Sequence, residues 1–238
     1  MVRSFFDPAL AVESLPFVLM GLRYTVVIAV ASMTAGMLLG LPIALARMSK
    51  RRVLTGPARL YISFMRGTPV LVLLFLFYFG LPSLGIGLSA VAAAISAFGL
   101  NSAAFIAEID RGAILSVPRG QWESARSLGM SEAQILFRVV LPQAARVAVP
   151  SLSNVMLDLI KATSLASVIT VQEVLLNAKI VAGRTFDTFT MYLTAALVYW
   201  AVCSLFSLFQ DRLERRLDVA MAGPGGGRAP ARGPAAAE

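Results

Sequence analysis

The side chains that most often carry catalysis or hold metals are scarce in this sequence of 238 residues. There is no histidine and only one cysteine, Cys203, so the chain has no His-based catalytic site, no His or Cys zinc site and no internal disulfide. None of its lysines follows a glycine, which excludes an ATP-binding loop of the GxxxxGK[ST] type. We therefore expect no catalytic residue, no metal and no cofactor in this chain.

Two opposite charges, Asp158 and Lys161, interrupt an apolar stretch at 147–172. They are three residues apart and share one helix face. Either charge alone costs about 2.5–3.5 kcal/mol at the middle of a membrane, so such residues usually face a cavity or a partner. With the hydroxyls of Thr163 and Ser164 they form a surface suited to a ligand that carries both an ammonium and a carboxylate. Two interpretations stay open, a substrate path and a structural ion pair.

The composition is that of a membrane protein. Hydrophobic residues make up 58% of the chain and charged residues 14%, whereas soluble domains are about half apolar and about a quarter charged. So few charges cannot cover a water-exposed surface of this size, which excludes a soluble enzyme, a disordered protein and a fibrous repeat. The net charge of +8 is high enough for a nucleic-acid-binding protein, but the basic residues are distributed as in a membrane protein, and no nucleic-acid partner is expected.

The apolar stretches predict an all-α integral membrane protein with about five transmembrane helices. A helix needs about 20 mostly apolar residues to cross the hydrocarbon core of a bilayer. A break at 81–87, which contains proline and glycine, divides one long uncharged stretch into two. The five predicted spans cover about 24–46, 69–80, 88–107, 147–172 and 188–210.

The basic residues predict the orientation, because Lys and Arg accumulate on the cytoplasmic side of membrane proteins. Sixteen of them lie after the first, the third or the fifth predicted span. Four lie on the opposite side, namely Arg3, Arg23, Lys179 and Arg184. We expect the N-terminus outside, the C-terminus in the cytoplasm, and a basic cytoplasmic connection at 47–66.

The chain divides into three parts. Residues 1–19 lack the basic start and cleavage site of a secretory signal and are expected to be a short N-terminal lead-in at the outer surface. Residues 20–215 form the transmembrane domain, whose longest cytoplasmic loop is 111–146. Residues 221–238 are mostly Gly, Pro and Ala, and we expect them to be disordered.

The long loop predicts two short helices joined by a hinge. A first helix is expected at 121–128, with Gly129 as its C-terminal stop. Ser131 and Gln134 fit a capping box at the start of a second helix. That helix is expected to reach about Val140 and to end at Pro142. Such a hinged element is stiff enough to transmit force from a partner to the neighbouring spans.

The spacing in this loop resembles the EAA loop of ABC-transporter permeases. The matching residues are Glu123, Ser124, Ala125, Gly129, Leu141 and Pro142, with Ser124 in place of the usual alanine. Arg-Gly-Thr-Pro at 66–69 and Lys-Ala-Thr-Ser-Leu at 161–165 are similar to segments of permeases for polar amino acids, of the histidine, glutamine and arginine type. Together the matches cover roughly residues 20–215.

The resemblance implies a fold, a function and partners. The fold is that of a type I ABC importer permease, and the six loop residues are coupling positions that dock on a separate ATPase subunit, which binds ATP and Mg. Ala125 is expected to let that partner approach closely. A second permease subunit, identical or sister, completes the pore, and an extracytoplasmic binding protein delivers the amino acid. The expected location is the bacterial cytoplasmic membrane, in contact with its lipid.

An autonomous ion-coupled carrier or channel is the alternative function. Such a protein needs its own coupling site and no ATPase. The loop at 119–142 has no evident purpose in a stand-alone carrier, so it favours the ATP-driven importer.

Overall fold

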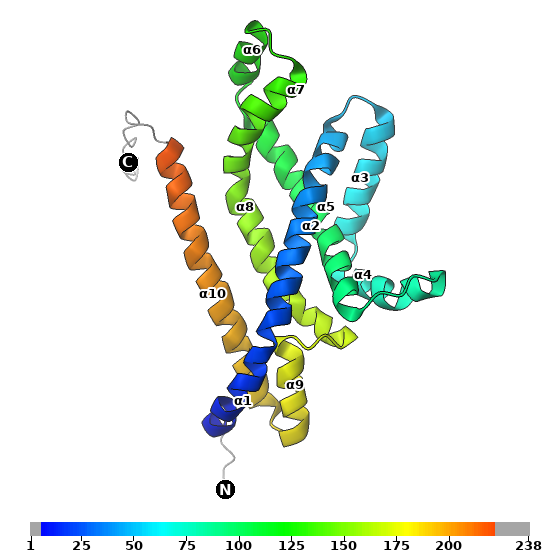
Figure 1. Cartoon of the computed structure of the whole chain (residues 1–238), viewed down its shortest axis with the longest axis vertical. Coiled ribbons are helices and arrows are strands. Elements are labelled where there is room, and N and C mark those ends of the chain that lie inside the picture. The colour runs from blue at the N-terminus through cyan, green and yellow to red at the C-terminus, as the bar shows by residue number, and fades with distance from the viewer. Residues whose placement is uncertain (1–5, 222–238) are drawn as a thin grey trace, which may run out of the picture.

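The computed structural model describes residues 6–221, and within this range every regular element is helical (Figure 1). The α-helices in chain order are α1 (Pro8–Met20), α2 (Leu22–Met48), α3 (Arg52–Gly67), α4 (Val70–Phe75), α5 (Ala90–Ser116), α6 (Arg119–Ser127), α7 (Glu132–Gln134), α8 (Leu141–Ala162), α9 (Val174–Thr185) and α10 (Thr188–Met221). Two π-helical segments, Leu76–Gly80 and Ile135–Val140, and two 3₁₀ segments, Leu81–Leu84 and Thr163–Ile169, connect some of them.

Four helical stretches are long and apolar enough to cross a membrane. They are Pro8–Met48, Ala90–Ser116, Glu132–Ile169 and Thr188–Arg215. A fifth candidate is the helix pair Arg52–Gly67 and Val70–Leu84, which is bent by 103°. The predicted all-α fold with about five spans is therefore confirmed for the described residues.

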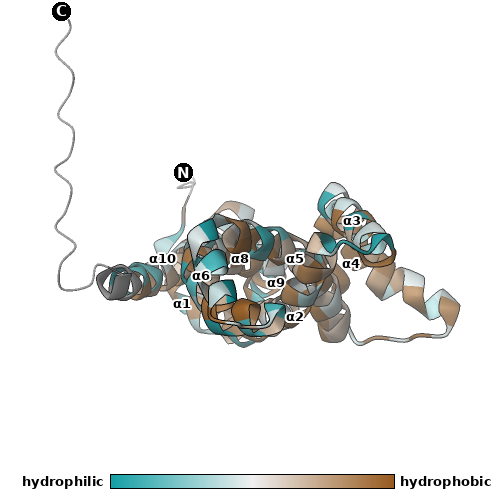
Figure 2. Cartoon of the chain, turned by 90° about the horizontal axis from the view of Figure 1, so that it is seen from above, coloured by the Kyte–Doolittle hydropathy of each residue, from teal (hydrophilic) through white to brown (hydrophobic). Residues whose placement is uncertain are grey.

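Apolar side chains cover the outside of this bundle. Leu38, Trp200 and Leu205 expose 71%, 69% and 70% of their surface, and brown apolar residues lie on the outward faces of the helices in Figure 2. Soluble monomers rarely expose a continuous apolar surface of this extent, because water penalises it. Lipid does not, and the exposed apolar belt fits a membrane protein.

The N-terminal lead-in is helical where the structure describes it. Asp7 caps α1 by accepting N–H bonds from Ala9 and Leu10, and α1 continues at Gly21 into α2. The apolar face of α1 packs on α9 and α10 through Val18. The part of the expected lead-in that the structure describes is therefore a helix joined to the first span. Residues 1–5 and the predicted tail, except its first residue, Met221, lie outside the described residues.

The prediction for the second span is wrong in its bounds. Residues 69–80 contain only six residues of α-helix before the π-helical segment begins. The preceding residues, expected to form a basic cytoplasmic connection, instead form α3, because Ala58, Ile62 and Met65 give it one apolar face that is buried. Two hydrogen bonds fix α3 to α5: the Tyr61 hydroxyl donates to the Leu100 carbonyl at 2.6 Å, and the Asn101 amide donates to the Met65 carbonyl at 2.7 Å.

The packing of α2 on α5 is close because α2 presents two glycines to it. A Cβ added at Gly36 would lie 2.8 Å from the Ser102 hydroxyl, and one added at Gly40 would lie 2.5 Å from Ile106 Cγ2. Small residues four apart allow two membrane helices to approach closely. The pattern therefore serves packing within this chain.

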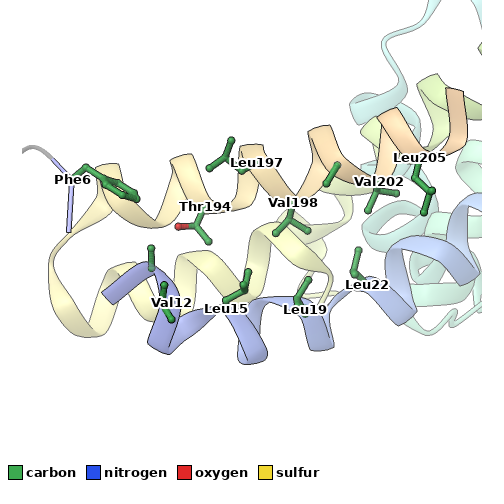
Figure 3. A pocket seen from close by; sticks show the side chains of 12 residues that line it. Phe6, Val12, Leu15, Leu19, Leu22, Thr194, Leu197, Val198, Val202 and Leu205 are labelled. Atoms are coloured by element: carbon green, nitrogen blue, oxygen red, sulfur yellow. The ribbon is translucent and has the colours of Figure 1, made fainter. Parts of the chain in front are cut away.

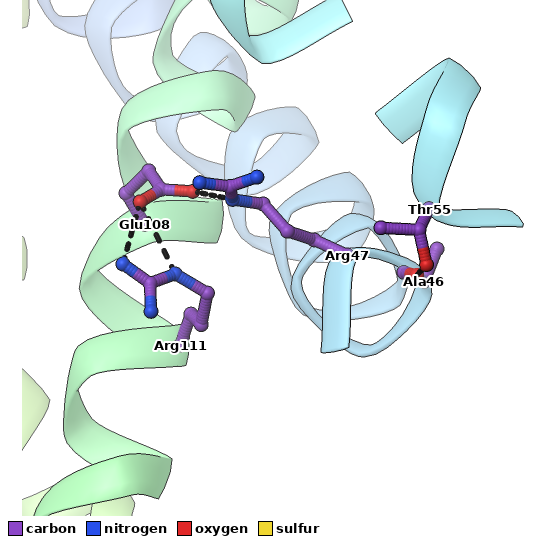
Figure 4. Close-up of polar contacts among 5 residues, drawn as sticks. All are labelled: Ala46, Arg47, Thr55, Glu108 and Arg111. Atoms are coloured by element: carbon purple, nitrogen blue, oxygen red, sulfur yellow. Dashed lines mark hydrogen bonds and ion pairs between the residues drawn. The ribbon is translucent and has the colours of Figure 1, made fainter. Parts of the chain in front are cut away.

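A charged cluster ties the same two helices together at the end of the bundle that bears α6. Glu108 of α5 accepts hydrogen bonds from Arg47 of α2 and from Arg111, whose Nη2 lies 2.9 Å from Glu108 Oε2 (Figure 4). Just beyond Arg47 the chain turns into α3, and there the Thr55 hydroxyl lies 3.4 Å from the Ala46 carbonyl. One partly buried carboxylate thus pairs with two guanidinium groups, Arg47 at the end of α2 and Arg111 on α5.

We expect Gly40→Ala to destabilise the protein by about 1–3 kcal/mol, because its Cβ forces the branched Ile106 side chain to move. The measurement is the midpoint of thermal unfolding in detergent. Gly56→Ala in α3 is the matched control, since its Cβ meets no atom within 4 Å, and it should stabilise by about 0.5–1 kcal/mol. Equal shifts for the two variants would contradict this account of the α2–α5 contact.

Candidate functional site

The loop between α5 and α8 contains a helix with a well-defined end. α6 runs from Arg119 to Ser127, and Gly129 adopts a positive φ of 75°. The Gly129 N–H donates to the Arg126 carbonyl and the Met130 N–H donates to the Ala125 carbonyl, at 2.9 and 3.2 Å. This pair of bonds is a Schellman motif, in which a glycine takes the left-handed position. The predicted stop at Gly129 is confirmed.

Ala125 faces the interior of the loop. Its side chain is 4% exposed and packs in a cluster with Ile114, Ile135, Val140 and Ala144. The expectation that Ala125 lets a partner surface approach closely is therefore wrong. Its small size allows α6 to lie against the chain that leads into α8, which holds the two parts of the loop together.

The exposed side of α6 carries two further residues of the motif, and a third, Gly129, follows its end. Glu123, Ser124 and Gly129 are exposed, and Leu128 beside them exposes 81% of its surface. Figure 1 shows α6 and α7 projecting from one end of the bundle. A carboxylate, a hydroxyl and a large apolar side chain therefore lie together on a surface that a partner could contact.

The second part of the loop is continuous with α8, and the prediction that it ends at Pro142 is wrong. The Ser131 capping box forms as predicted, with the Gln134 side chain accepting from the Ser131 N–H at 2.9 Å. The widened π turn at Ile135–Val140 precedes Pro142, and the Gln143 side chain donates to the Val139 carbonyl at 2.9 Å. Pro142 is the second residue of α8, and the missing N–H of a proline is tolerated in the first turn of an α-helix.

Leu141 and Pro142 therefore lie within a long helix. Leu141 is partly buried against the cluster around Ala125, and Pro142 is exposed. The helical stretch Glu132–Ile169 carries them into the membrane candidate span. A displacement of the loop is thus passed to α8 without a flexible connection.

An ion pair closes the hinge between the two parts of the loop. Arg126 Nε lies 2.9 Å from Glu132 Oε1. The Glu132 carboxylate raises the pKa of Arg126 through this hydrogen bond. Both side chains are more than half exposed, so the pair orients α6 relative to α7 more than it stabilises the fold.

Asp158 and Lys161 contact each other, which is one of the two interpretations that the sequence leaves open. Lys161 Nζ lies 2.8 Å from Asp158 Oδ1, and the two side chains are 60% and 76% exposed. Asp158 lines a cavity of about 210 Å³ with Asn101 and Ser102 of α5. Lys161 lines a different crevice, between α8 and α10. The pair thus stands between two hollows, with its charges open to whatever fills them.

Of the two hydroxyls predicted beside this pair, only that of Ser164 remains partly exposed. Thr163 is fully buried and donates to the Ile160 carbonyl at 2.7 Å. The Ser164 hydroxyl donates to the Lys161 carbonyl at 2.7 Å. The tighter 3₁₀ turn that begins at Thr163 rotates its side chain into the bundle, so the expected mixed surface loses this hydroxyl.

A buried carboxylate at Glu173 organises the end of the bundle opposite α6. Glu173 is fully buried and accepts from the N–H groups of Leu175 and Leu176 at 2.9 and 2.8 Å and from the Tyr199 hydroxyl. Burial raises the pKa of Glu173, and these donors offset part of the rise. The sequence signal was a single acid between an apolar run and a helical segment, which does not distinguish a buried cap from an exposed one.

A family model and several relatives match this chain. The model described as "Binding-protein-dependent transport system inner membrane component" matches residues 32–219. The probable amino-acid ABC transporter permease protein YckA of Bacillus subtilis (strain 168) is 57% identical over 89% of this chain and 93% of its own length. The L-cystine transport system permease protein TcyB of the same strain is 46% identical over 83% of this chain and 85% of its own.

Solved structures show the same fold. The crystal structure of an amino acid ABC transporter with histidines superposes with a TM-score of 0.83 and 37% identity, covering 88% of this chain and 98% of that one. An inward-facing structure of the MetNI methionine ABC transporter has a TM-score of 0.72 over 84% of this chain and 96% of its own, at 21% identity. These neighbours confirm the predicted type I importer permease fold.

We expect Gly129→Ala to loosen the loop, because a Cβ on a residue in the left-handed conformation costs about 1–2 kcal/mol. This cost comes from the backbone conformation alone, since a Cβ at Gly129 meets no neighbouring atom. Trypsin cleavage at the exposed Arg126 and Arg138 should accelerate about tenfold, since local opening follows the local free energy. Gly129→Asn should change the rate less, because Asn tolerates this conformation.

The control for this prediction is Gly120→Ala in the first turn of α6. Its Cβ meets no atom within 4 Å, and its φ is not positive. It should leave the cleavage rate unchanged. If both alanine variants accelerate cleavage equally, the hinge does not depend on the backbone conformation of Gly129.

Proposed function

Because the chain belongs to the family of binding-protein-dependent transport system inner membrane components, we propose that it is the permease subunit of an ATP-driven importer of a polar amino acid. In this proposal the chain itself is no enzyme, and a separate ATPase subunit binds ATP and Mg and hydrolyses the nucleotide. A second permease subunit, identical or sister, and an extracytoplasmic binding protein complete the transporter in the bacterial cytoplasmic membrane.

The observation that carries this proposal is the continuity between the projecting loop and a membrane helix. α6 is locked at its end by the bonds around Gly129, and the second part of the loop runs without a break into α8. A partner that moves α6 therefore moves the helix that holds Asp158 and Lys161. This mechanical link is what an importer needs and what a stand-alone carrier lacks.

The exposed motif residues are the proposed contact with the ATPase. Glu123, Ser124 and Gly129 are at the surface of the loop, while Ala125 and Leu141 support them from inside. Pro142 lies on the outer side of α8 at the base of the loop. The proposed orientation places this loop and the C-terminus in the cytoplasm and the N-terminus outside, in line with the excess of basic residues on the loop side.

The proposed substrate is a polar amino acid, bound as a zwitterion near Asp158 and Lys161. Two relatives are an amino-acid permease and an L-cystine permease by name. A carboxylate and an ammonium 2.8 Å apart can exchange their mutual contact for the ammonium and carboxylate of such a ligand. Ser164 lies beside them, and Thr163 contributes only through the fold of the turn.

The direct test is uptake into vesicles that contain this permease, its partner subunits and a panel of amino acids. We expect uptake that requires ATP and the binding protein, and that is selective for polar amino acids. Uptake at the full rate without an ATPase subunit would support an autonomous carrier and overturn the proposal.

We expect Glu123→Lys to reduce ATP-driven uptake to the level measured without ATP, because it reverses the charge of an exposed contact residue. The amount of permease in the membrane should not change, since an exposed side chain contributes little to stability. Glu13→Lys is the matched control, because Glu13 is an exposed acid on α1 at the opposite end of the bundle. Normal ATP-coupled uptake by the Glu123 variant would disprove its role.

We expect Asp158→Ala to weaken substrate affinity or to change the order of preference among amino acids, because it removes the carboxylate that would meet the substrate ammonium. The measurement is the concentration dependence of uptake for each amino acid at equal permease amounts. An unchanged profile would identify the pair as structural. Asp187→Ala, which removes an acid that caps α10, controls for a general loss of negative charge.

A further inference from the structure

The last membrane helix, α10, has two chemically different faces. Cys203, Ser204, Ser207, Gln210, Asp211 and Glu214 recur at the spacing of one helix face. Leu205 and Phe209 lie on the opposite face and expose 70% and 60% of their surface. A polar stripe is costly against lipid, so a membrane helix normally turns it toward water or protein.

The polar stripe borders a crevice between α8 and α10. The crevice has a volume of about 400 Å³, and its polar lining comprises Lys161 of α8 and Cys203, Ser204, Ser207 and Asp211 of α10. Small-molecule sites in proteins have volumes of about 300–1,000 Å³. In Figures 1 and 2 α10 leans away from α8 toward its C-terminal end. The crevice is thus large enough for an amino acid, and it runs toward the end of the bundle that bears the α6–α7 loop.

The lining residues show that the crevice extends along α10 from the level of Lys161 to that of Asp211. Lys161, paired with Asp158, lies at the level of Cys203. Asp211 is eight residues further along α10, which places it about 12 Å nearer the loop end. Between them stand the half-buried Ser204 and Ser207. Hydroxyls at successive turns can hydrogen-bond in sequence to a solute that moves along the helix.

The other side of α10 shows what a lipid-facing hollow looks like in this protein. The groove between α10 and α1 is lined by apolar side chains, among them Leu15, Leu19, Val198 and Leu205, with Thr194 at one end (Figure 3). Lipid chains satisfy such a groove, whereas they leave a lysine, an aspartate and two serines unsolvated. The contrast between the two sides of one helix indicates that the crevice contains water.

We propose that the crevice between α8 and α10 is a hydrated segment of the translocation path, and that Ser204, Ser207 and Asp211 line it between the Asp158–Lys161 pair and the cytoplasm. The inference rests on the proposed import function and adds a specific route on α10 to it. The solute class is a zwitterionic amino acid, which finds charges of both signs at one end, hydroxyls along the way and a carboxylate at the exit.

The single cysteine of the chain reports directly on water in the crevice. The probe is sulfonatoethyl methanethiosulfonate, a charged reagent that needs a thiolate in water, applied to the complete complex in nanodiscs with labelling of this chain measured by mass. Cys203 should react. In a Cys203→Ser background, Ser207→Cys should also react, and about tenfold faster than Leu205→Cys, which places the thiol on the lipid face. Equal rates at 205 and 207, or an unreactive Cys203, overturn the proposal.

Transport tests whether the hydrated crevice is the route. Ser207→Phe should lower ATP-driven uptake about tenfold by filling the crevice. Leu205→Phe, which places the same aromatic side chain on the opposite face, should not lower it. Thermal unfolding of both variants in detergent separates blockage from misfolding, and Ser207→Ala, which adds no bulk, should retain uptake within about twofold. Normal uptake by the Ser207→Phe variant would mean that the amino acid takes another route, and it would overturn the proposal.

The two proposals fail in different ways. ATP-driven uptake by the parent complex together with an unreactive Cys203 rejects the crevice and keeps the importer. No ATP-driven uptake of any amino acid rejects the importer and with it the route, even where the labelling shows water between α8 and α10.

Discussion

The absence of water from the interior of a bilayer is the constraint on which this structure depends. Backbone groups in hydrocarbon must find partners within the chain, and helices meet that demand within each segment. Every regular element of the described residues is helical, including the π and 3₁₀ turns that join the α-helices. Where the backbone departs from a helix, as at Glu173, side chains supply the missing partners. Charges follow the same rule, because each must lie beside a partner, a cavity or an interface.

This constraint explains why the loop and α8 form one mechanical unit. α5 ends at Ser116 and α8 begins at Leu141, and a flexible link between them would lose any displacement that a partner applies. The Schellman motif at Gly129, the buried Ala125 and the Arg126–Glu132 pair make the loop rigid. The π turn before Pro142 keeps it helical up to α8. A coupling element of this kind is the structural basis of the proposed importer function.

The same constraint gives the two faces of α10 different environments. One face packs near α1 through apolar side chains, which lipid chains can contact without a desolvation cost. The other carries hydroxyls and a carboxylate opposite Lys161. In our proposal α10 separates a lipid surface from a polar path, and the Asp158–Lys161 pair lies at the end of that path farther from the α6–α7 loop.

Local sequence was sufficient wherever one residue type has one conformational use. The glycine stop at 129, the capping box at Ser131 and the all-helical membrane class followed from residue chemistry and composition, and the EAA-like spacing indicated the family. Packing decided what local patterns left open. α3 is a packed helix because its apolar face lies against α5. Ala125 is buried because Ile135 lies behind it. Pro142 continues a helix because a π turn precedes it. The first outcome depends on a contact between residues 39 apart in the chain, and the other two depend on the geometry of the turn at Ile135–Val140, which residue types alone do not determine.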